Sequence, residues 1–395
     1  MIAPPVVPVA AVRGRRVRVS PACEFVAVDS LPWPTRRWFI ESPSAGRGTA
    51  VGLIVGTPDS AVPARVVDRA GATLLASLRR PRPVCSDDES DVFLKLVCDG
   101  ILEVDCAGRW SSGPRVWESV AVDGGRQRPT SGLGRLSFAA VEYAQHLHLT
   151  SARSITARLY CYHRVPLSRR WWRLYPGPET VLRLMGSAVL QKHWRRGASR
   201  RATLVDWLTF TRPDVQRGAL RYKLYVSPAV STLGAVLPIL GEVLTAAGAR
   251  HFKVGPDAAG LLRPDKIVVY AEDHAELAAI GKSLSAGLAG VPAHGVPFTA
   301  QVDGDGLLSW GLDPGPDAAP LGDGPESWRW SVARRLGEYL RAADRAGLRR
   351  FHPAEFALAR LRLDGVDIRS FRPSHRSSPA AGQVNRPATV PGGRP

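Results

Sequence analysis

The sequence has few cysteines, and none of them stands in a metal-binding pattern. Five cysteines are spread over 395 residues without a C-x-x-C pair. This odd count and wide spacing favour neither a zinc site nor a complete disulfide framework. His146 and His148 lie two residues apart, which on a helix places them on different faces. We therefore expect reduced thiols and no metal centre.

Long apolar runs are also missing. No stretch of the sequence is long enough and apolar enough to cross a bilayer as a helix. At the N-terminus, the basic cluster at residues 13–18 follows the apolar residues, which is the reverse of the order in a secretory signal. We therefore expect a cytoplasmic protein with no membrane partner.

Acidic residues are scarce relative to basic ones. The chain has 53 Lys and Arg against 35 Asp and Glu, a formal net charge of +18. Such an excess implies an anionic partner, either nucleic acid, a phosphopeptide or an acidic leader peptide. Arg outnumbers Lys, which fits bidentate contacts to phosphate or carboxylate. It fits equally well a coding sequence that favours Arg and Ala codons.

Two segments, residues 168–175 and 192–196, interleave basic and aromatic side chains. This pattern is typical of nucleic-acid binding, in which cations contact phosphates and rings stack on bases. No zinc-finger or helix-turn-helix signature accompanies it, however. Arg–Trp stacking also occurs in ordinary folds, and a basic groove suits a phosphorylated peptide as well. Nucleic acid is therefore the less favoured partner.

The length predicts two domains, and 45% hydrophobic residues suffice for a sizeable core. We assign residues 1–20 to a flexible lead-in and residues 21–130 to a β-rich N-terminal domain that is a candidate for peptide docking. Residues 131–369 form an α+β domain, and residues 370–395 form a tail of disordered composition. In the N-terminal domain, strands are expected at residues 25–28, 37–41, 51–55 and 73–78.

The stretch at residues 221–228 organises the second domain. It reads as a strand in which Tyr, Leu and Val alternate with polar partners until a proline ends it. Lys223 and Tyr225 are two residues apart, so they leave the strand on the same face. Together they form a candidate base and acid, or else a pair of ordinary strand residues with solvated tips.

Apolar spacing predicts further helices and strands after this stretch. Helices are expected at residues 137–149, 232–247, 273–288, 327–343 and 353–363, and strands at residues 251–255, 266–270 and 307–310. Lys253, Arg263 and Lys266 lie in or beside these strands. A sheet can bring them close to Lys223, and four neighbouring cations repel one another unless an anion is present. The pattern thus predicts a phosphate or carboxylate site, or alternatively a spread of solvated charges.

Short motifs in this half of the chain resemble a known family. Its pattern is a Lys-x-His-hydrophobic-Ser strand, an aromatic-Lys strand, and a Lys before an apolar strand that ends in Tyr. The matching residues here are Lys223-Leu224-Tyr225-Val226-Ser227, Phe252-Lys253 and Lys266-Ile267-Val268-Val269-Tyr270, and Ser327-Trp328-Arg329-Trp330 is similar to the C-terminal helix. The family comprises the lyase portion of class III and class V lanthionine synthetases and the related bacterial effector phosphothreonine lyases.

The sequence departs from this family at two positions. Tyr225 stands where the family usually places a general-acid His. Gly311 follows Ser309-Trp310, in place of the Arg-bearing segment that helps to hold phosphate in the effector lyases. The first departure affects the assignment of the general acid, and the second affects the set of residues that would bind the phosphate.

The resemblance implies an α+β C-terminal domain of the phosphothreonine-lyase type after the β-rich N-terminal domain. It also implies β-elimination of phosphate from phosphoserine or phosphothreonine to give dehydroalanine or dehydrobutyrine, without a metal or organic cofactor. The reaction needs a neutral amine as base, cations that hold the phosphate, and a donor for the leaving oxygen. The implied roles are Lys223 as base, Tyr225 as acid, and Lys253, Arg263, Lys266, Arg329 and Arg334 as phosphate ligands.

The resemblance further implies a phosphorylated precursor peptide as substrate, in the manner of lanthipeptide maturation. No Gly-rich phosphate loop and no H-R-D or D-F-G set is visible in the sequence. A separate kinase must then supply the phosphate, and a separate cyclase could add cysteine thiols afterwards. The alternative from another class is a non-catalytic basic protein that binds nucleic acid or a leader peptide.

Overall fold

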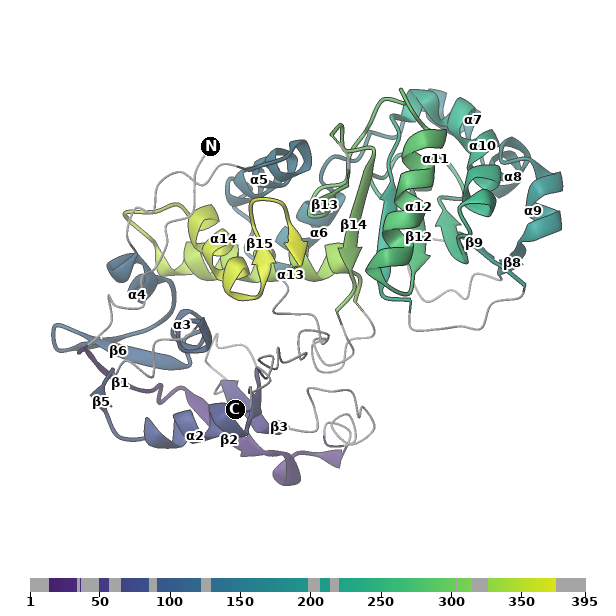
Figure 1. Cartoon of the computed structure of the whole chain (residues 1–395). Helices are drawn as coiled ribbons and strands as arrows, with labels where there is room; N and C mark the ends of the chain where they lie inside the picture. The colour runs from purple at the N-terminus through teal and green to yellow at the C-terminus, as the bar shows by residue number, and fades with distance from the viewer. Residues whose placement is uncertain are drawn as a thin grey trace, which may run out of the picture.

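A computed structural model describes residues 14–33, 36, 50–56, 65–84, 91–121, 129–197, 207–213, 220–302, 304–314 and 326–373. Within these residues the chain is α+β, as the sequence predicts. Figure 1 shows an N-terminal unit, a large sheet with its covering helices, and a layer of helices between the two.

The large sheet has seven antiparallel strands in the order β13-β14-β10-β12-β11-β9-β8. They are β8 (Arg195–Gly197), β9 (Leu208–Thr211), β10 (Tyr222–Val226), β11 (His251–Val254), β12 (Ile267–Ala271), β13 (Ala300–Gln301) and β14 (Leu308–Leu312). The strands predicted around residues 222, 251, 266 and 307 are therefore confirmed, and the tertiary structure places β10 and β12 at the centre.

One face of this sheet is buried under helices α10 (Leu233–Ala246) and α12 (His274–Gly287). Alternate strand residues such as Leu224, Phe252 and Val269 form the core on that side. Because side chains alternate between the two faces of a strand, the residues between them point to the opposite face. That second face carries the polar residues of the same strands.

Shorter helices surround this core. They are α7 (Arg169–Leu174), α8 (Pro178–Leu184), α9 (Ser187–His193) and α11 (Ala258–Leu261). Helices α8 and α9 pack against α10, and α7 packs against α11. The basic and aromatic segment at residues 168–175 is thus a short surface helix.

A layer of four helices lies beside the sheet (Figure 1). It comprises α5 (Gly132–Gln145), α6 (Ala152–Cys161), α13 (Trp328–Ala346) and α14 (Pro353–Leu363). Phe138, Leu336 and Phe356 are among its buried core residues. Helix α13 begins where the sequence predicts, because the Ser327 hydroxyl accepts a hydrogen bond from the Trp330 amide at 3.3 Å.

Among its described residues, the N-terminal unit contains two small sheets, of order β5-β1-β6-β7 and β2-β3-β4, together with the helices α2, α3 and α4. The strands are β1 (Arg16–Val19), β2 (Cys23–Ala27), β3 (Ala50–Gly56), β4 (Arg65–Asp68), β5 (Arg82–Pro83), β6 (Leu102–Cys106) and β7 (Arg109–Ser111). The helices are α2 (Arg69–Ser77), α3 (Asp91–Cys98) and α4 (Gly113–Val120), and a 3₁₀ turn spans Val28–Ser30. Strands β2 and β3 confirm two of the predicted strands.

Three expectations, two for the N-terminal unit and one for the C-terminal tail, need correction. Residues 73–78, expected as a strand, lie mostly in α2, because their Ala and Leu favour a helix. Leu75 in this helix and Leu78 directly after it are buried in the core. Strand β1 lies inside the predicted lead-in and pairs with β5 and β6. Strand β16 (Arg372–Pro373) pairs with β15 (Val366–Asp367) inside the predicted tail. The strand expected at residues 37–41 lies outside the described residues.

Ion pairs join the N-terminal unit to the helical layer. Arg360 on α14 is 2% exposed and donates from Nε and Nη2 to the two carboxylate oxygens of Asp99, both at 2.8 Å. Its Nη1 donates to Asp364 at 2.8 Å, and Lys95 on α3 lies 3.4 Å from that carboxylate.

Among the described helices, none has the length and hydropathy required to span a membrane.

Candidate active site on the polar face of the central sheet

Strand register places the predicted catalytic strand residues on one face. Lys223 lies opposite Tyr270, and Tyr225 lies opposite Val268 across the β10–β12 pair. Lys253 on β11 also lies opposite Val268, from the other side of β12. Since directly opposed residues share a face, Lys223, Tyr225 and Lys253 all point away from the helix-covered core. The expected common face of Lys223 and Tyr225 is therefore confirmed.

Lys223 has a carboxylate partner. It is 7% exposed, and its ammonium is paired with Asp313, which follows β14. The other carboxylate oxygen of Asp313 accepts a hydrogen bond from the Trp328 amide at 2.8 Å, at the first turn of α13. Gly311, opposite Lys223, leaves room for the Trp328 ring, because a Cβ there would lie 2.4 Å from it. Asp313 thus connects Lys223 to the start of α13.

Lys253 is surrounded by rings instead. Its Nζ lies 4.4 Å from the centroid of the Trp207 ring and 5.6 Å from that of Tyr270. Among the described residues no carboxylate forms an ion pair with it. Burial, and then the positive charge of Lys223, lowers the pKa of Lys253 to about 8. The residue as a whole is partly buried.

Asp265 gathers two arginines at the edge of this face. Arg263 donates from Nε and Nη2 to the two oxygens of Asp265 at 2.9 and 3.0 Å, and Arg329 Nη1 lies 2.8 Å from the same carboxylate. The Tyr160 hydroxyl donates to Asp265 at 3.2 Å. Burial alone would raise the pKa of Asp265, but Arg329 and Arg263 hold it well below its usual value. Asp265 therefore stays ionised and fixes both guanidinium groups.

The cluster carries a positive excess. Four cations, Lys223, Lys253, Arg263 and Arg329, stand against the two carboxylates of Asp313 and Asp265. With Lys253 protonated, two positive charges remain uncompensated among these groups. Cations gathered at a half-buried surface favour a bound anion, and a phosphate dianion would neutralise this excess.

Tyr225 lies on the same face, but its side chain is buried. It is 2% exposed and packs in a small cluster with Val268 and Val296. Burial, and then the negative charge of Asp313, raises the pKa of its phenol well above the usual value. Tyr225 therefore remains protonated at neutral pH and releases a proton reluctantly. This environment argues against the role of general acid that the sequence resemblance implies.

Two predicted phosphate ligands do not face the cluster. Lys266 is fully buried, and its Nζ donates to Ser227 Oγ at 3.4 Å, to the Pro228 carbonyl at 3.1 Å and to His294 Nδ1 at 2.8 Å. Arg334 is bound by Glu326 at 2.7 Å and by Glu338 at 2.8 Å. The partners of Lys266 are not residues of the cluster, and Arg334 pairs with Glu326 and Glu338, which do not belong to the cluster either. We therefore remove both from the candidate site.

The comparisons with known proteins find structural similarity only. No family model matches the chain, and no curated protein matches it in sequence. The effector protein from Pseudomonas syringae pv. tomato strain DC3000 has 14% identity and a TM-score of 0.41, over 61% of this chain and 98% of its own. The effector protein from Pseudomonas syringae pv. syringae strain 61 has 15% identity and a TM-score of 0.38, over 62% and 98%.

A third solved structure is the type III effector/phosphothreonine lyase OspF from Shigella flexneri. It has 11% identity and a TM-score of 0.26, over 44% of this chain and 86% of its own. All three similarities are weak. The resemblance to lanthionine synthetases rests on the sequence motifs alone.

The sequence analysis missed several residues of the site. Trp207, Asp265, Asp313 and Tyr160 contact the cations, but none belongs to a motif that we recognised. For Asp265 a signal was available, since it follows Arg263-Pro264 directly before a buried strand. Asp313 and Tyr160 come from distant parts of the chain, and no local pattern marks them.

Proposed function

We propose that the chain is a lyase that eliminates phosphate from a phosphoserine or phosphothreonine residue of a peptide. The observation that carries the proposal is the cluster on the polar face, in which an amine with a lowered pKa stands among fixed cations. A β-elimination requires such an amine as base and such cations to stabilise the leaving phosphate.

Lys253 is the proposed base, in place of Lys223. Only a neutral amine can remove a proton, and a pKa of about 8 leaves a useful fraction of Lys253 neutral near pH 7. Lys223 is committed to Asp313, whereas Lys253 touches only rings among the described residues. We assign Lys223 to the phosphate, together with Arg263, and we assign Arg329 to the positioning of Asp265.

The proposed reaction begins when the neutral Nζ of Lys253 takes the α-proton of the phosphorylated residue. The electron pair of the Cα–H bond forms the Cα–Cβ double bond, and the Cβ–Oγ bond breaks. Phosphate leaves with that oxygen and with the bonding electrons, and Lys223 and Arg263 stabilise its charge. Since the Tyr225 phenol holds its proton strongly, phosphate leaves without protonation in this scheme.

The experiment is to incubate the protein with a phosphothreonine peptide and to measure the peptide mass. Wild-type protein should convert it to the dehydrobutyrine peptide with loss of phosphoric acid. The variant Lys253→Ala should lower the rate by roughly 10²–10⁴-fold, the contribution expected of a general base, and should still bind the phosphopeptide.

Arg183→Gln, an exposed change on α8, is the control for loss of one positive charge and should leave the rate unchanged. Retention of phosphate in every peptide, together with tight phosphopeptide binding, would contradict the lyase proposal. That result would favour the alternative, a non-catalytic basic protein that binds anions.

The motif resemblance supports one extension of the proposal, to a lanthipeptide precursor as the substrate. A separate kinase would then phosphorylate the precursor, and a separate cyclase could add cysteine thiols to the product. The test is a precursor phosphorylated at Ser or Thr, whose dehydrated product should accept an added thiol. The geometry itself supports the elimination of phosphate without regard to the origin of the peptide.

A further inference from the structure

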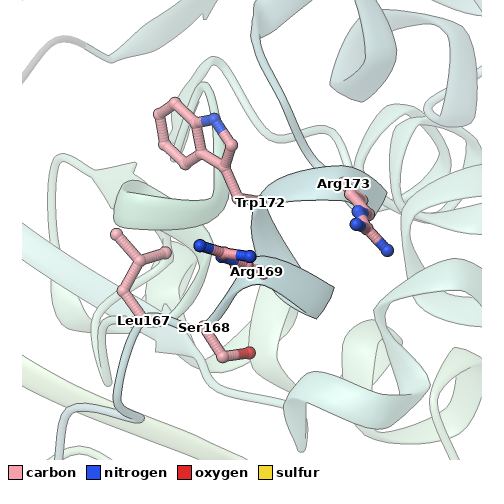
Figure 2. Close-up of a pocket in the computed structure, with 5 residues that line it drawn as sticks. All are labelled: Leu167, Ser168, Arg169, Trp172 and Arg173. Carbon is pink, nitrogen blue, oxygen red and sulfur yellow. The ribbon is translucent and has the colours of Figure 1, made fainter.

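A second candidate site lies on the surface helix α7. A hollow of about 340 Å³ is lined there by Leu167, Ser168, Arg169, Trp172 and Arg173. Figure 2 shows that the first two come from the loop that enters α7 and the other three from the helix itself. All of them except Leu167 belong to the basic and aromatic segment at residues 168–175, which the proposed reaction does not use.

The hollow is positively charged and has no internal counter-charge. Residues 163–178 contain four arginines and no Asp or Glu. Among the described residues, no ion pair involves Arg169 or Arg173, and both are exposed. Both nevertheless line the same hollow, because they are four residues apart on a helix. An anionic group is therefore the complementary ligand.

The hollow is also apolar on one side. Leu167 is 53% exposed and Trp172 is 48% exposed, so both present apolar surface to solvent beside the two arginines. A small inorganic anion would neutralise the arginines but would leave the apolar surface of Trp172 and Leu167 exposed to water. A peptide satisfies both, since an acidic side chain can reach the arginines while its neighbours cover Trp172 and Leu167. The composition therefore favours a peptide over a free ion.

The hollow is held at a fixed position relative to the candidate active site. The Val165 amide donates to the Leu262 carbonyl at 3.1 Å, and Arg164 Nη2 donates to the Ala259 carbonyl at 2.6 Å. Leu262 directly precedes Arg263, and Leu167 stands two residues after Val165. The Cα atoms of Leu167 and Arg263 thus lie within roughly 19 Å, a span of about six residues of extended peptide.

From these observations we infer that the α7 hollow binds an acidic side chain of the peptide whose phosphorylated residue occupies the candidate active site. The acidic group is a carboxylate or a second phosphate, up to about six residues away from the eliminated phosphate. This inference rests on the proposed function. It adds a preference for phosphopeptides with acidic residues near the phosphorylation site.

The test uses two labelled phosphothreonine peptides that differ only at the fourth to sixth residues on either side, which are Glu in one and Gln in the other. Fluorescence anisotropy gives Kd, and mass spectrometry gives the elimination rate. In wild-type protein the Glu peptide should bind roughly tenfold more tightly, the effect expected of charge-assisted hydrogen bonds. The rate at saturating peptide should not differ.

The double variant Arg169→Gln/Arg173→Gln should lose this preference, and Arg183→Gln, the matched control on α8, should keep it. Thermal unfolding checks that the variants are folded. Equal Kd values for the two peptides in wild type, or a preference that survives the double variant, would overturn the inference. So would tighter binding of a single-stranded RNA that depends on Arg169 and Arg173 and displaces both peptides equally. Absence of elimination from either peptide instead counts against the proposed function, whereas the ratio of Kd values tests the hollow separately.

Discussion

At the scale of the residue, two lysines of one sheet face differ because of what surrounds them. Both lie over the Tyr270 ring, but Lys223 also meets the carboxylate of Asp313, whereas Lys253 meets the ring of Trp207. A ring face attracts a cation but does not replace its lost hydration fully. Burial therefore lowers the pKa of Lys253, and the two lysines become suited to different tasks.

The first prediction concerns the pH dependence of the proposed elimination. Since only neutral Lys253 can accept the α-proton, kcat/KM should rise with pH and level off above about 8, the pKa of that amine. The measurements should start at about pH 7, because the phosphate group of the peptide titrates near pH 6 and is then already mostly dianionic. A rate that is flat or falls between about pH 7 and pH 9 would contradict Lys253 as the base.

Lys266 leads to a second prediction, about stability rather than activity. Burial lowers its pKa from 10.5 to about 7 in the folded protein. Between these values the unfolded chain binds more protons than the folded one, so the stability of the folded state should rise with pH over that window. The variant Lys266→Met should show a weaker rise.

Chemical denaturation at several pH values between 7 and 10 measures this difference. The comparison must use the change with pH, because Lys266→Met also leaves the Pro228 carbonyl without its donor. Parallel curves for the two proteins would show that Lys266 is charged in the folded state.

At the scale of the element, close helix packing positions the arginine of the site. Helix α13 carries Arg329 in its first turn and packs along α6, the helix that carries Tyr160. The helices approach closely at Gly337, where an added Cβ would lie 2.5 Å from Thr156 Oγ1 and 2.8 Å from the Ala152 carbonyl. Glycine at this position thus allows the two helices to approach and brings Arg329 to Asp265.

The third prediction follows from this contact. In an open helix interior, Gly→Ala stabilises a protein by roughly 0.5–1 kcal/mol. At Gly337 the substitution should instead destabilise by about 1–3 kcal/mol, because the methyl group meets the backbone of α6. Gly234 in α10 is the matched control, since nothing lies within 4 Å of its added Cβ, and Gly234→Ala should stabilise. Denaturant unfolding gives both values, and equal signs would contradict the close contact.

At the scale of the whole molecule, the N-terminal unit is joined to the helical layer by buried charges. Arg360 binds Asp99 of the N-terminal unit and Asp364 of the layer, and only 2% of it is exposed. Loss of one partner from such a network leaves the others buried and unpaired. The unit and the layer should therefore unfold together.

The fourth prediction, checked by denaturant unfolding, tests how much these buried charges stabilise the junction. Arg360→Ala should lower the free energy of unfolding by roughly 3–5 kcal/mol, because Asp99 and Asp364 lose their main partner. Arg362→Ala, on the same helix but partly exposed, should cost less than about 1 kcal/mol. A similar loss for both variants would show that the ion pairs contribute little to the junction.

The secondary structure of the second half was largely predictable from the sequence. Residues 232–247 and 353–363 carry helical spacing, and residues 266–270 form an apolar run, so local pattern alone located them. The same reasoning failed at residues 73–78, where a short apolar run is ambiguous between strand and helix. Packing against Val17 and Val104 resolved that ambiguity in favour of a helix.

For the site, the sequence alone determined that Lys223 and Tyr225 share a face, because the twofold repeat of a strand is a local property. Only the tertiary structure decided which cations meet which carboxylates. Lys253, Asp265, Asp313 and Arg329 are brought together by the order of the strands and by the packing of α13 on α6. The charge state of each group depends on the neighbours that these long-range contacts supply, and no local pattern encodes them.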